Sequence, residues 1–412
     1  MQFSKFSLNN SILKAVSEER FHTATLVQEK AIPLILDKKN VIVSANTGTG
    51  KTAAFALPIL ELITKETENL ETEKKKIKSV ILTPTRELAI QILENFESFG
   101  KYTNSNATAV YGGVSLEPQK EKLASGVDIL IATPGRLIDL QMQGNIDLSN
   151  VEIFVLDEAD LMLDMGFIND IKKIESLCPR KKQTLLFSAT MPEKIVELAN
   201  ATLKNAVKVE IHPEETTAKN IGQLLYYLPK KNKTDLCLNL LRNTINGRII
   251  IFRRTKFGVD KLENSLLKNE YKVASIHGDK TQATRNKAIE DFKNKKAHIL
   301  IATDVASRGI DITNVDCIIN FDMPNVPETY VHRIGRTGRA GKSGIAFSFC
   351  SPDENGYIKL IENLIERPIK VVTDHPYVIN KPKHTKKQPN TISKNKKGRK
   401  SEASKKKKKR WY

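Results

Sequence analysis

An acidic tetrapeptide, Asp157-Glu158-Ala159-Asp160, directly follows the apolar run Ile153 to Leu156. Carboxylates at the end of a buried strand can hold Mg²⁺ and polarise an attacking water. Upstream, the segment Gly48 to Thr52 supplies glycines whose backbone N–H groups can surround phosphates. Together the two segments predict one ATP site.

The upstream loop stands in the context that a phosphate-binding loop requires. It follows a predicted strand and precedes the helical run Ala53 to Leu57. Gly48 and Gly50 let the backbone approach the phosphates, Lys51 neutralises the β and γ charges, and Thr52 holds Mg²⁺. Ala45 takes the place of the usual first glycine. The predicted nucleotide-binding loop comprises Ala45, Asn46, Thr47, Gly48, Thr49, Gly50, Lys51 and Thr52.

The downstream half has no phosphate loop of its own. The string Gly341-Lys342-Ser343 imitates one, but Arg336 stands where a glycine is required, and a strand rather than a helix follows. One ATP must therefore serve both halves. The downstream half offers instead the segment His332 to Arg339, with three arginines and intervening glycines. An arginine from another domain can accelerate phosphoryl transfer by about 10³ to 10⁵. A merely basic surface loop is the alternative, but the first half has no obvious arginine finger.

Short β-rich runs alternate with helical stretches twice along the chain. This pattern predicts an α/β fold with two parallel sheets covered by helices. Ligands of such sheets bind at the carboxyl ends of the strands, where nearly every unusual motif falls. We expect a first domain over 1–210, a linker over 211–220 and a second domain over 221–372. The predicted strands are 40–45, 79–83, 128–132, 151–156 and 184–188, then 248–252, 272–276, 298–302, 317–320 and 345–349.

The net charge of +19 is concentrated at the C-terminus. From Thr373 to Tyr412, 13 lysines and 2 arginines stand against Asp374 and Glu402, so this stretch carries +13. It lacks apolar periodicity, which predicts a disordered tail over 373–412. The tail is predicted to tether phosphate backbones. A solubilising tail and a localisation signal are the alternatives.

Composition favours a cytoplasmic protein. No apolar run approaches the roughly 18 residues of a membrane span, and residues 1–6 contain no apolar signal core. The four cysteines form no C-x-x-C pair, which argues against a zinc site or a disulfide framework.

At this point the motifs resemble a known family. The chain looks like a DEAD-box ATP-dependent RNA helicase of superfamily 2, and most of all like the bacterial RhlE-like branch. The resemblance covers roughly residues 3–372, with the motifs in the family's order and spacing. Besides the ATP segments and the arginine segment, it rests on Pro84-Thr85-Arg86-Glu87-Leu88-Ala89, Gly112-Gly113, Thr133-Pro134-Gly135-Arg136, Ser188-Ala189-Thr190 and Thr303 to Asp311.

The resemblance implies two tandem RecA-like domains that close around ATP, Mg²⁺ and single-stranded RNA. By matched position, Asp157 would reach Mg²⁺ and Glu158 would be the general base. Arg336 and Arg339 would be the arginine fingers, and His332 would bridge the domains near the γ-phosphate. The remaining nucleotide positions are Gln28, which would read adenine, Phe21 and Phe3 beside it, and Asp304 on the ribose; Asp160, Ser188 and Thr190 would couple ATP to RNA.

The resemblance also implies a sequence-independent RNA site, because the matched groups suit contacts to phosphates and sugars. Recognition of the 2′-OH would favour RNA over DNA. The chain departs from the adenine motif at Arg20 and Ala24, where the family usually has Gly and Pro, and this puts adenine selectivity in question. The matched RNA positions are Pro84, Thr85, Arg86, Gly113, Thr133 and Arg136, then Thr255, His277, Gly278 and Thr303.

Two functional classes remain open at this point. The first is an RNA-dependent ATPase that locally unwinds short RNA duplexes or remodels ribonucleoproteins. The second is an ATP-gated RNA clamp or scaffold, and a DNA helicase is a weaker third. Glu158, Arg336 and Arg339 favour turnover, because a clamp would tolerate their loss. We expect a monomer, since no heptad run is present, and ribonucleoprotein partners through the basic tail.

Overall fold

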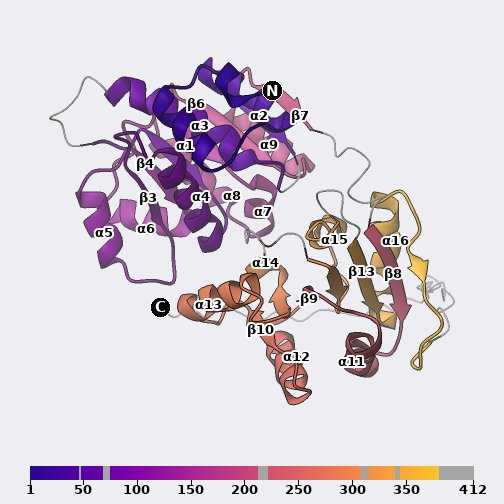
Figure 1. Cartoon of the computed structure of the whole chain (residues 1–412). Coiled ribbons are helices and arrows are strands. Elements are labelled where there is room, and N and C mark those ends of the chain that lie inside the picture. Colours follow the sequence, from indigo (N-terminus) through magenta and orange to yellow (C-terminus); the bar gives the residue numbers. More distant parts are fainter. Residues whose placement is uncertain are drawn as a thin grey trace, which may run out of the picture. The chain divides into compact units, whose positions relative to one another are not determined.

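The computed structural model describes residues 1–45, 48–67, 75–211, 221–307, 312, 315–338 and 344–379. Its strands form two seven-stranded sheets, in which all strand pairs are parallel (Figure 1). This confirms the predicted α/β fold with two parallel sheets. The predicted positions Asn46, Thr47 and Arg339, most of the linker (212–220) and the tail from residue 380 lie outside the described residues.

The first sheet has the strand order β3-β4-β2-β5-β6-β1-β7. Five of its strands overlap the predicted ones, whereas β3 and β7 were not predicted. Both are four-residue strands at the edges of the sheet without a continuous apolar run, since β3 contains Thr108 and β7 alternates valines with charged residues. The strands are β1 Val41–Ser44, β2 Ser79–Leu82, β3 Ala107–Val110, β4 Ile129–Ala132, β5 Ile153–Leu156, β6 Gln183–Ser188 and β7 Val207–Glu210.

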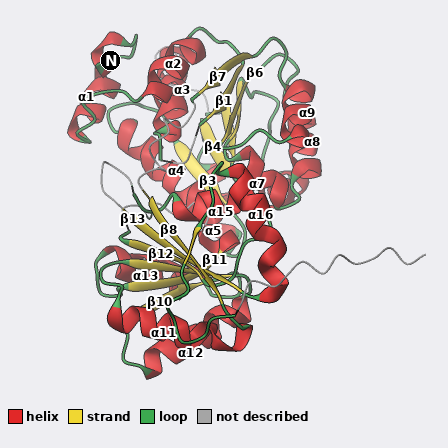
Figure 2. Cartoon of the chain, turned by 90° about the vertical axis from the view of Figure 1, so that its right-hand side faces the viewer, coloured by secondary structure: helices red, strands yellow, loops and turns green. Residues whose placement is uncertain are grey.

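Helices flank both faces of the first sheet, as Figure 2 shows in red. One face is covered by the first four helices and the other by α5 to α9, because their buried residues belong to two separate apolar clusters. The helical elements are η1 Phe3–Lys5, α1 Asn10–Glu18, α2 Leu26–Leu36, α3 Lys51–Thr67, α4 Arg86–Phe99, α5 Glu117–Ala124, α6 Pro134–Met142, α7 Ala159–Asp164, α8 Ile168–Leu177 and α9 Glu193–Thr202.

The second sheet has the order β10-β11-β9-β12-β13-β8-β14. Its strands are β8 Ile221–Tyr227, β9 Ile249–Arg253, β10 Val273–Ile276, β11 Ile299–Thr303, β12 Cys317–Asn320, β13 Gly344–Cys350 and β14 Lys370–Val371. Its helical elements are η2 Lys230–Asn232, α11 Lys233–Asn243, α12 Lys256–Lys268, α13 Gln282–Lys293, α14 Asp304–Ser307, α15 Pro327–Ile334, η3 Pro352–Glu354 and α16 Asn355–Leu364. The strands β8 and β14 were not predicted.

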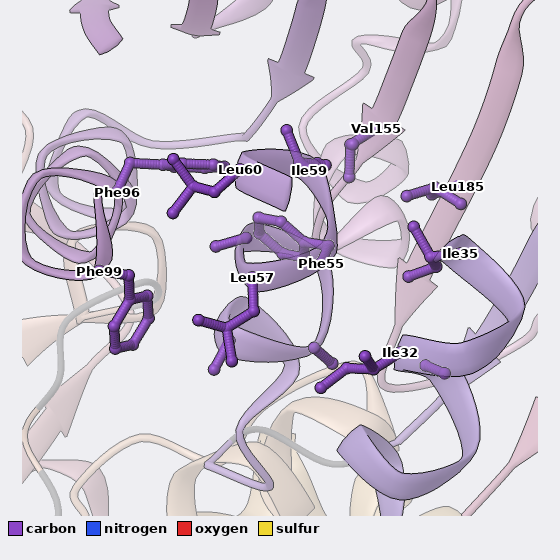
Figure 3. Packing of buried hydrophobic residues seen from close by; sticks show 14 of the residues in the cluster. Ile32, Ile35, Phe55, Leu57, Ile59, Leu60, Phe96, Phe99, Val155 and Leu185 are labelled. Atoms are coloured by element: carbon purple, nitrogen blue, oxygen red, sulfur yellow. The ribbon is translucent and has the colours of Figure 1, made fainter. Parts of the chain in front are cut away.

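The core of the first domain is centred on α3. Phe55 of this helix is fully buried, with its ring 5.2 Å from that of Phe187 on β6 and 6.3 Å from that of Phe96 on α4. Figure 3 shows Phe55 in the same cluster as Val155 and Leu185 of the sheet. Because α3 begins at Lys51, this packing holds the phosphate loop against the sheet.

The end of the second domain lies later than predicted. Residues 373–379, which were assigned to the tail, return to the edge of the second sheet. The N–H of Val372 donates to the carbonyl of Leu225, and the N–H of Ile379 donates to that of Tyr227. The ring of His375 also lies 5.4 Å from that of Tyr226. The tail boundary therefore shifts from residue 373 to residue 380.

The predicted motifs lie at the carboxyl ends of the strands, as expected for ligand sites of parallel sheets. Thr85, Thr133 and Thr255 come shortly after β2, β4 and β9, and each is the residue that precedes a helix. Threonine is favoured there because its hydroxyl can accept from the first helical N–H groups. Among the described helices, none is both long and apolar enough to cross a membrane.

Candidate functional site

Lys51 is held at the start of α3 by carboxylates of the acidic tetrapeptide. Its Nζ lies 2.9 Å from Glu158 Oε1 and donates to the carbonyl of Ala45 at 3.1 Å. Burial lowers the pKa of Lys51, but the charges of Glu158 and Asp157 outweigh this effect, so its pKa is raised. The lysine is therefore a fixed cation, and an ATP phosphate can compete for it with Glu158.

Asp157 is suited to a metal ion. It is 2 % exposed, and its Oδ1 has no hydrogen-bond partner within the described part of the chain. Burial and the neighbouring charge of Glu158 raise the pKa of Asp157 to about 7. A buried carboxylate oxygen without a donor matches the hard oxygen ligands that Mg²⁺ prefers. Thr52, the second residue of α3, brings a hydroxyl to the same loop.

Glu158 has a left-handed backbone conformation, with φ 51° and ψ 52°. This conformation is rare for a residue with a side chain, and it persists only where the surrounding structure enforces it. Here it lies between the end of β5 and the start of α7. The turn directs the carboxylate of Glu158, the predicted general base, toward Lys51.

Gln28 lies against the phosphate loop. It is 1 % exposed, its Nε2 donates to the carbonyl of Gly50 at 3.1 Å, and its Oε1 accepts from the N–H of Thr25. Gly50 has φ 87°, and a Cβ there would lie 2.4 Å from Gln28 Nε2. The Thr25 hydroxyl in turn donates to the carbonyl of Thr49. Gln28 therefore braces the loop, while its predicted contact with adenine stays a prediction.

The predicted aromatic pair lies together beside α4. The rings of Phe3 and Phe21 are 6.5 Å apart, and that of Phe21 is 5.8 Å from Phe99. Phe3 is 4 % exposed, whereas Phe21 is 40 % exposed. Arg20, which replaces the usual glycine, has φ 60°. Glycine adopts such a positive φ without steric strain, which explains the family's preference for glycine at this position. Arg20 adopts the same conformation with a side chain.

Asp160 connects the acidic tetrapeptide with the segment after β6. Its Oδ2 accepts from the N–H and the hydroxyl of Thr190 at 2.9 and 2.8 Å, and its N–H donates to Ser188 Oγ. Burial raises the pKa of Asp160, but the nearby charges of His332 and Lys51 outweigh burial and lower it. The three predicted coupling residues therefore form one hydrogen-bonded unit.

A cavity of about 420 Å³ contains residues of both domains. The first domain contributes the predicted base and coupling residues, and the second contributes two residues of the arginine segment. Within the described residues, this is where the acidic tetrapeptide and the arginine segment meet. The lining residues are Glu158, Asp160, Leu161, Leu163, Asp164, Thr190, Met191, Pro192, Val326, Glu328, Thr329, His332, Arg336 and Leu364.

In the first domain, two of the predicted RNA positions are arginines, Arg86 and Arg136. Arg86 lies over Gly113, where an added Cβ would be 2.0 Å from Arg86 Nη1; Gly113 also has φ 79°. Arg136 donates from Nη2 to the carbonyl of Val114, and its Nη1 is buried with no hydrogen-bond partner among the described residues. Glycine at position 113 therefore lets an arginine lie on the backbone. Pro84, Thr85 and Thr133 belong to the same strand ends.

In the second domain, the predicted RNA positions follow three neighbouring strands. Thr255 follows β9 and caps α12, Gly278 follows β10 with open space around its Cα, and Thr303 ends β11. His277 is only 4 % exposed, and its Nε2 lies 2.9 Å from Asp260 Oδ1 while its Nδ1 accepts from the N–H of Asp279. Both ring nitrogens are thus engaged within the domain, so His277 shapes the loop that presents Gly278.

Asp304, predicted to bind the ribose, forms a two-pronged ion pair with Arg333. The Nε and Nη2 atoms of Arg333 lie 2.6 and 2.8 Å from the two carboxylate oxygens of Asp304. Arg333 is 2 % exposed, and its Nη1 also donates to Asn320 and to the carbonyl of Asp322. Arg333 therefore has a structural function, because it fixes α15 to the start of α14 and to β12.

Sequence reasoning missed a buried ion pair that joins α4 to α13. Glu87 Oε1 accepts from Arg285 Nη2 at 2.8 Å and from Gln282 Nε2 at 3.0 Å. Glu87 and Arg285 are 7 % and 4 % exposed. The available signal was the spacing of Gln282 and Arg285, three residues apart at the start of α13, which places both on one helical face.

Two family models match the chain. The family model described as DEAD/DEAH box helicase matches residues 25–198, and the helicase conserved C-terminal domain matches residues 232–341. The chain is 43 % identical over 366 residues to the ATP-dependent RNA helicase CshA of Limosilactobacillus reuteri, covering 88 % of this chain and 72 % of that protein.

Two further proteins are similar over most of the chain. The DEAD-box ATP-dependent RNA helicase RhpA of Helicobacter pylori is 42 % identical over 369 residues, covering 90 % of this chain and 73 % of that protein. The structure of S. cerevisiae Dbp5 bound to RNA and ADP BeF3 is 31 % identical with a TM-score of 0.79, covering 90 % of this chain and 95 % of that one. The RhlE-like branch stays a prediction.

Proposed function

Because this chain belongs to the DEAD-box family of ATP-dependent RNA helicases, we propose that its two RecA-like domains hydrolyse one ATP between them while holding single-stranded RNA. ATP would bind at Lys51 and the phosphate loop. RNA would bind at the carboxyl ends of β2, β4, β9, β10 and β11. Each hydrolysis event would release the RNA after local strand separation.

One observation carries this proposal, the cavity shared by Glu158 and Asp160 with His332 and Arg336. It brings the proposed general base, Glu158, and the proposed arginine finger, Arg336, to the same space from different domains. Glu158 would take a proton from the attacking water, and Arg336 would face the charge that develops on the γ-phosphate. Arg339 is proposed as the second finger from the sequence alone.

The first step is an exchange of partners at Lys51. Its ion pair with Glu158 competes with the phosphates of ATP, so nucleotide binding would separate the two side chains. Glu158 would then accept a water proton instead of a lysine hydrogen bond. Mg²⁺, which the Asp157 carboxylate and the Thr52 hydroxyl would hold, neutralises phosphate charge when bound. The orphaned Asp157 Oδ1 supports this assignment.

The RNA contacts would be independent of base sequence. The RNA surface consists of hydroxyls, glycines and the guanidinium groups of Arg86 and Arg136, which suit phosphates and sugars. The similarity to Dbp5 bound to RNA supports the same use of this surface. If the closed state accepts only a single strand, ATP shifts the population away from duplex. Short duplexes are therefore the proposed substrates, acted on by a cytoplasmic monomer.

Substitution of Glu158 by Gln tests the assignment of the base. We expect turnover to fall by about 10² to 10⁴, because the amide cannot take a proton. Binding of ATP and ATP-dependent binding of RNA should persist, since the substitution leaves Lys51 and the RNA surface intact. The readouts are phosphate release and RNA anisotropy.

Glu117→Gln provides the matched control, because that side chain is 72 % exposed on α5. It should leave both readouts unchanged. Wild-type turnover in Glu158→Gln would remove Glu158 as the base. Turnover without any dependence on RNA in the wild-type chain would contradict the coupling, and single-stranded DNA as effective as RNA would contradict the choice of substrate.

A further inference from the structure

The two sheets share one topology, so every strand of the second has a counterpart in the first. The orders β3-β4-β2-β5-β6-β1-β7 and β10-β11-β9-β12-β13-β8-β14 match strand for strand, with β8 in the place of β1. Lys51 follows the end of β1 at Ser44 by seven residues and is the first residue of α3. Lys233 follows the end of β8 at Tyr227 by six residues and is the first residue of α11. Lys233 thus has the topological place of the phosphate-loop lysine.

Lys233 is buried and points at a carboxylate. It is 1 % exposed, and its Nζ lies 2.6 Å from Glu354 Oε2 and donates to the carbonyl of Phe321 at 2.8 Å. Asp322 Oδ1 lies farther away, at 3.6 Å. In the first domain, the corresponding lysine pairs with Glu158, and ATP phosphates are proposed to displace that carboxylate. In the second domain, Lys233 pairs with Glu354, a carboxylate that several further donors also hold.

The carboxylate of Glu354 is surrounded by hydrogen-bond donors from the ends of four strands. Glu354 is 3 % exposed. Its contact with the N–H of Ser351 belongs to a local capping box at η3, and the hydroxyl of the same serine also donates to it. The others come from residues distant in the sequence and have no such local explanation. The five donors are Lys233 Nζ at 2.6 Å, Arg254 Nη2 at 2.8 Å, Ser351 Oγ at 2.8 Å, Ser351 N at 3.1 Å and Met323 N at 3.1 Å.

This donor set is the one that proteins use to hold phosphate. Backbone N–H groups, a hydroxyl, a lysine and an arginine converge on one oxyanion at the carboxyl edge of a parallel sheet. Besides the lysine, the set includes an arginine, a hydroxyl and two backbone N–H groups, from Ser351 and Met323. We propose that the second domain retains a phosphate seat and that the Glu354 carboxylate permanently occupies it.

The hydrogen bonds of Glu354 also hold two loops of the second domain, the one that contains Arg254 and the one that contains Met323. Arg254 directly precedes Thr255 at the proposed RNA surface, and Met323 lies in the loop that leads to α15. Glu354 Oε1 accepts from both. The internal carboxylate therefore does two things at once: it excludes a second nucleotide and it fixes the loops to each other.

The test is whether inorganic phosphate can replace the missing carboxylate. In the full chain, Glu354→Ala leaves the five donors without their acceptor, so its unfolding temperature should fall below that of the wild-type chain. Added phosphate, at constant ionic strength set with chloride, should narrow this gap in unfolding temperature between the variant and the wild-type chain. A Kd of about 5 mM would raise the folding constant of the variant roughly ten-fold at 50 mM phosphate. The wild-type chain shares the Lys51 loop and the basic tail, so the difference isolates the seat.

Two variants distinguish the seat from a general effect of phosphate. Lys233→Met combined with Glu354→Ala should lose the narrowing, because the seat then lacks its lysine. Glu61→Ala removes another buried carboxylate, which accepts from the N–H of Asn9 at 2.6 Å and pairs with Lys65 at 2.9 Å. Its gap to the wild-type chain should not respond to phosphate.

A gap for Glu354→Ala that stays constant, or one that narrows equally for Glu61→Ala, would overturn the proposal. Should Glu354→Ala not fold in chloride buffer, the fraction that refolds in phosphate becomes the readout. A higher refolded fraction in phosphate than in chloride supports the seat, and equal fractions contradict it.

Discussion

At the scale of single residues, the three carboxylates of the acidic tetrapeptide differ in charge state and partners because each has a different environment. Asp157 is buried beside Glu158, which favours its neutral form, whereas Asp160 is held ionised by Thr190 and nearby cations. Glu158 pairs with Lys51. Identical chemical groups therefore take different roles because one turn exposes them to different neighbours. The left-handed backbone of Glu158 makes that turn.

Substitution of Asp157 by Asn should stabilise the protein while abolishing activity. The raised pKa of about 7 means that ionised Asp157 destabilises the folded state, so wild-type stability falls as the pH rises toward 7. Asn has no charge to bury. Between pH 5 and the folded pKa of about 7, at about 1.4 kcal/mol per pKa unit, its advantage should grow on the order of 2–3 kcal/mol.

Denaturant unfolding of both proteins at pH 5 and pH 8 without nucleotide measures this effect. Phosphate release should be lost at both pH values. An equal difference in unfolding free energy at the two pH values would contradict the raised pKa of Asp157. The exposed substitution Asp37→Asn, at 64 % exposure, serves as the control that should show no growing advantage.

At the scale of elements, the sequence predicted those strands that form continuous apolar runs. β5, with four buried residues in IFVL, was predicted because a strand covered on both faces is apolar throughout. β7 was missed because it is an edge strand, VKVE, with only Val209 buried. The motifs at the strand ends followed from the same rule of sheet architecture. Lys233 and Glu354 could not be paired from the sequence, because 121 residues separate them.

The ion pair between α4 and α13 yields a prediction at this scale. Replacing Glu87 by Gln leaves the Arg285 guanidinium buried without its counter-charge, and Arg285→Gln does the converse. Each should lower RNA-stimulated turnover about ten-fold or more, because breaking a buried pair costs about 3–5 kcal/mol. The double variant should be no worse than the worse single one, since both remove the same contact.

Phosphate release with saturating RNA gives the four corners of this cycle. ATP binding without RNA should be unchanged, because neither residue lies at the Lys51 loop. Lys120→Gln, which removes a surface pair with Glu117, is the control and should have no effect. Strictly additive losses in the double variant would show that Glu87 and Arg285 do not act as a pair during turnover.

At the scale of the whole molecule, one topology is used twice with opposite results for phosphate. The first domain pairs Lys51 with Glu158, which we propose that ATP displaces, and the second places Lys233 on the more enclosed carboxylate of Glu354. Under the proposed function, one ATP would bind per chain, and the second domain would contribute arginines and RNA contacts. The same duplication explains why the RNA positions of both domains follow corresponding strands, β2 and β4 in the first sheet and β9 and β11 in the second.

Two truncations at the C-terminus should separate stability from RNA affinity. Removal of 380–412 deletes the lysine-rich stretch, which contains all 13 lysines and both arginines of residues 373–412. Fewer counterions would then be released on binding, so RNA affinity should fall and its dependence on salt should flatten, while the unfolding temperature stays the same. Removal of 373–412 also deletes the contacts of Ile379 and His375 with β8, so this variant alone should unfold at a lower temperature.

RNA anisotropy from 50 to 200 mM salt and thermal unfolding measure the two effects. An unchanged salt slope in the shorter deletion would show that the tail does not contact the RNA backbone, and equal unfolding temperatures for both truncations would show that residues 373–379 do not stabilise the second domain.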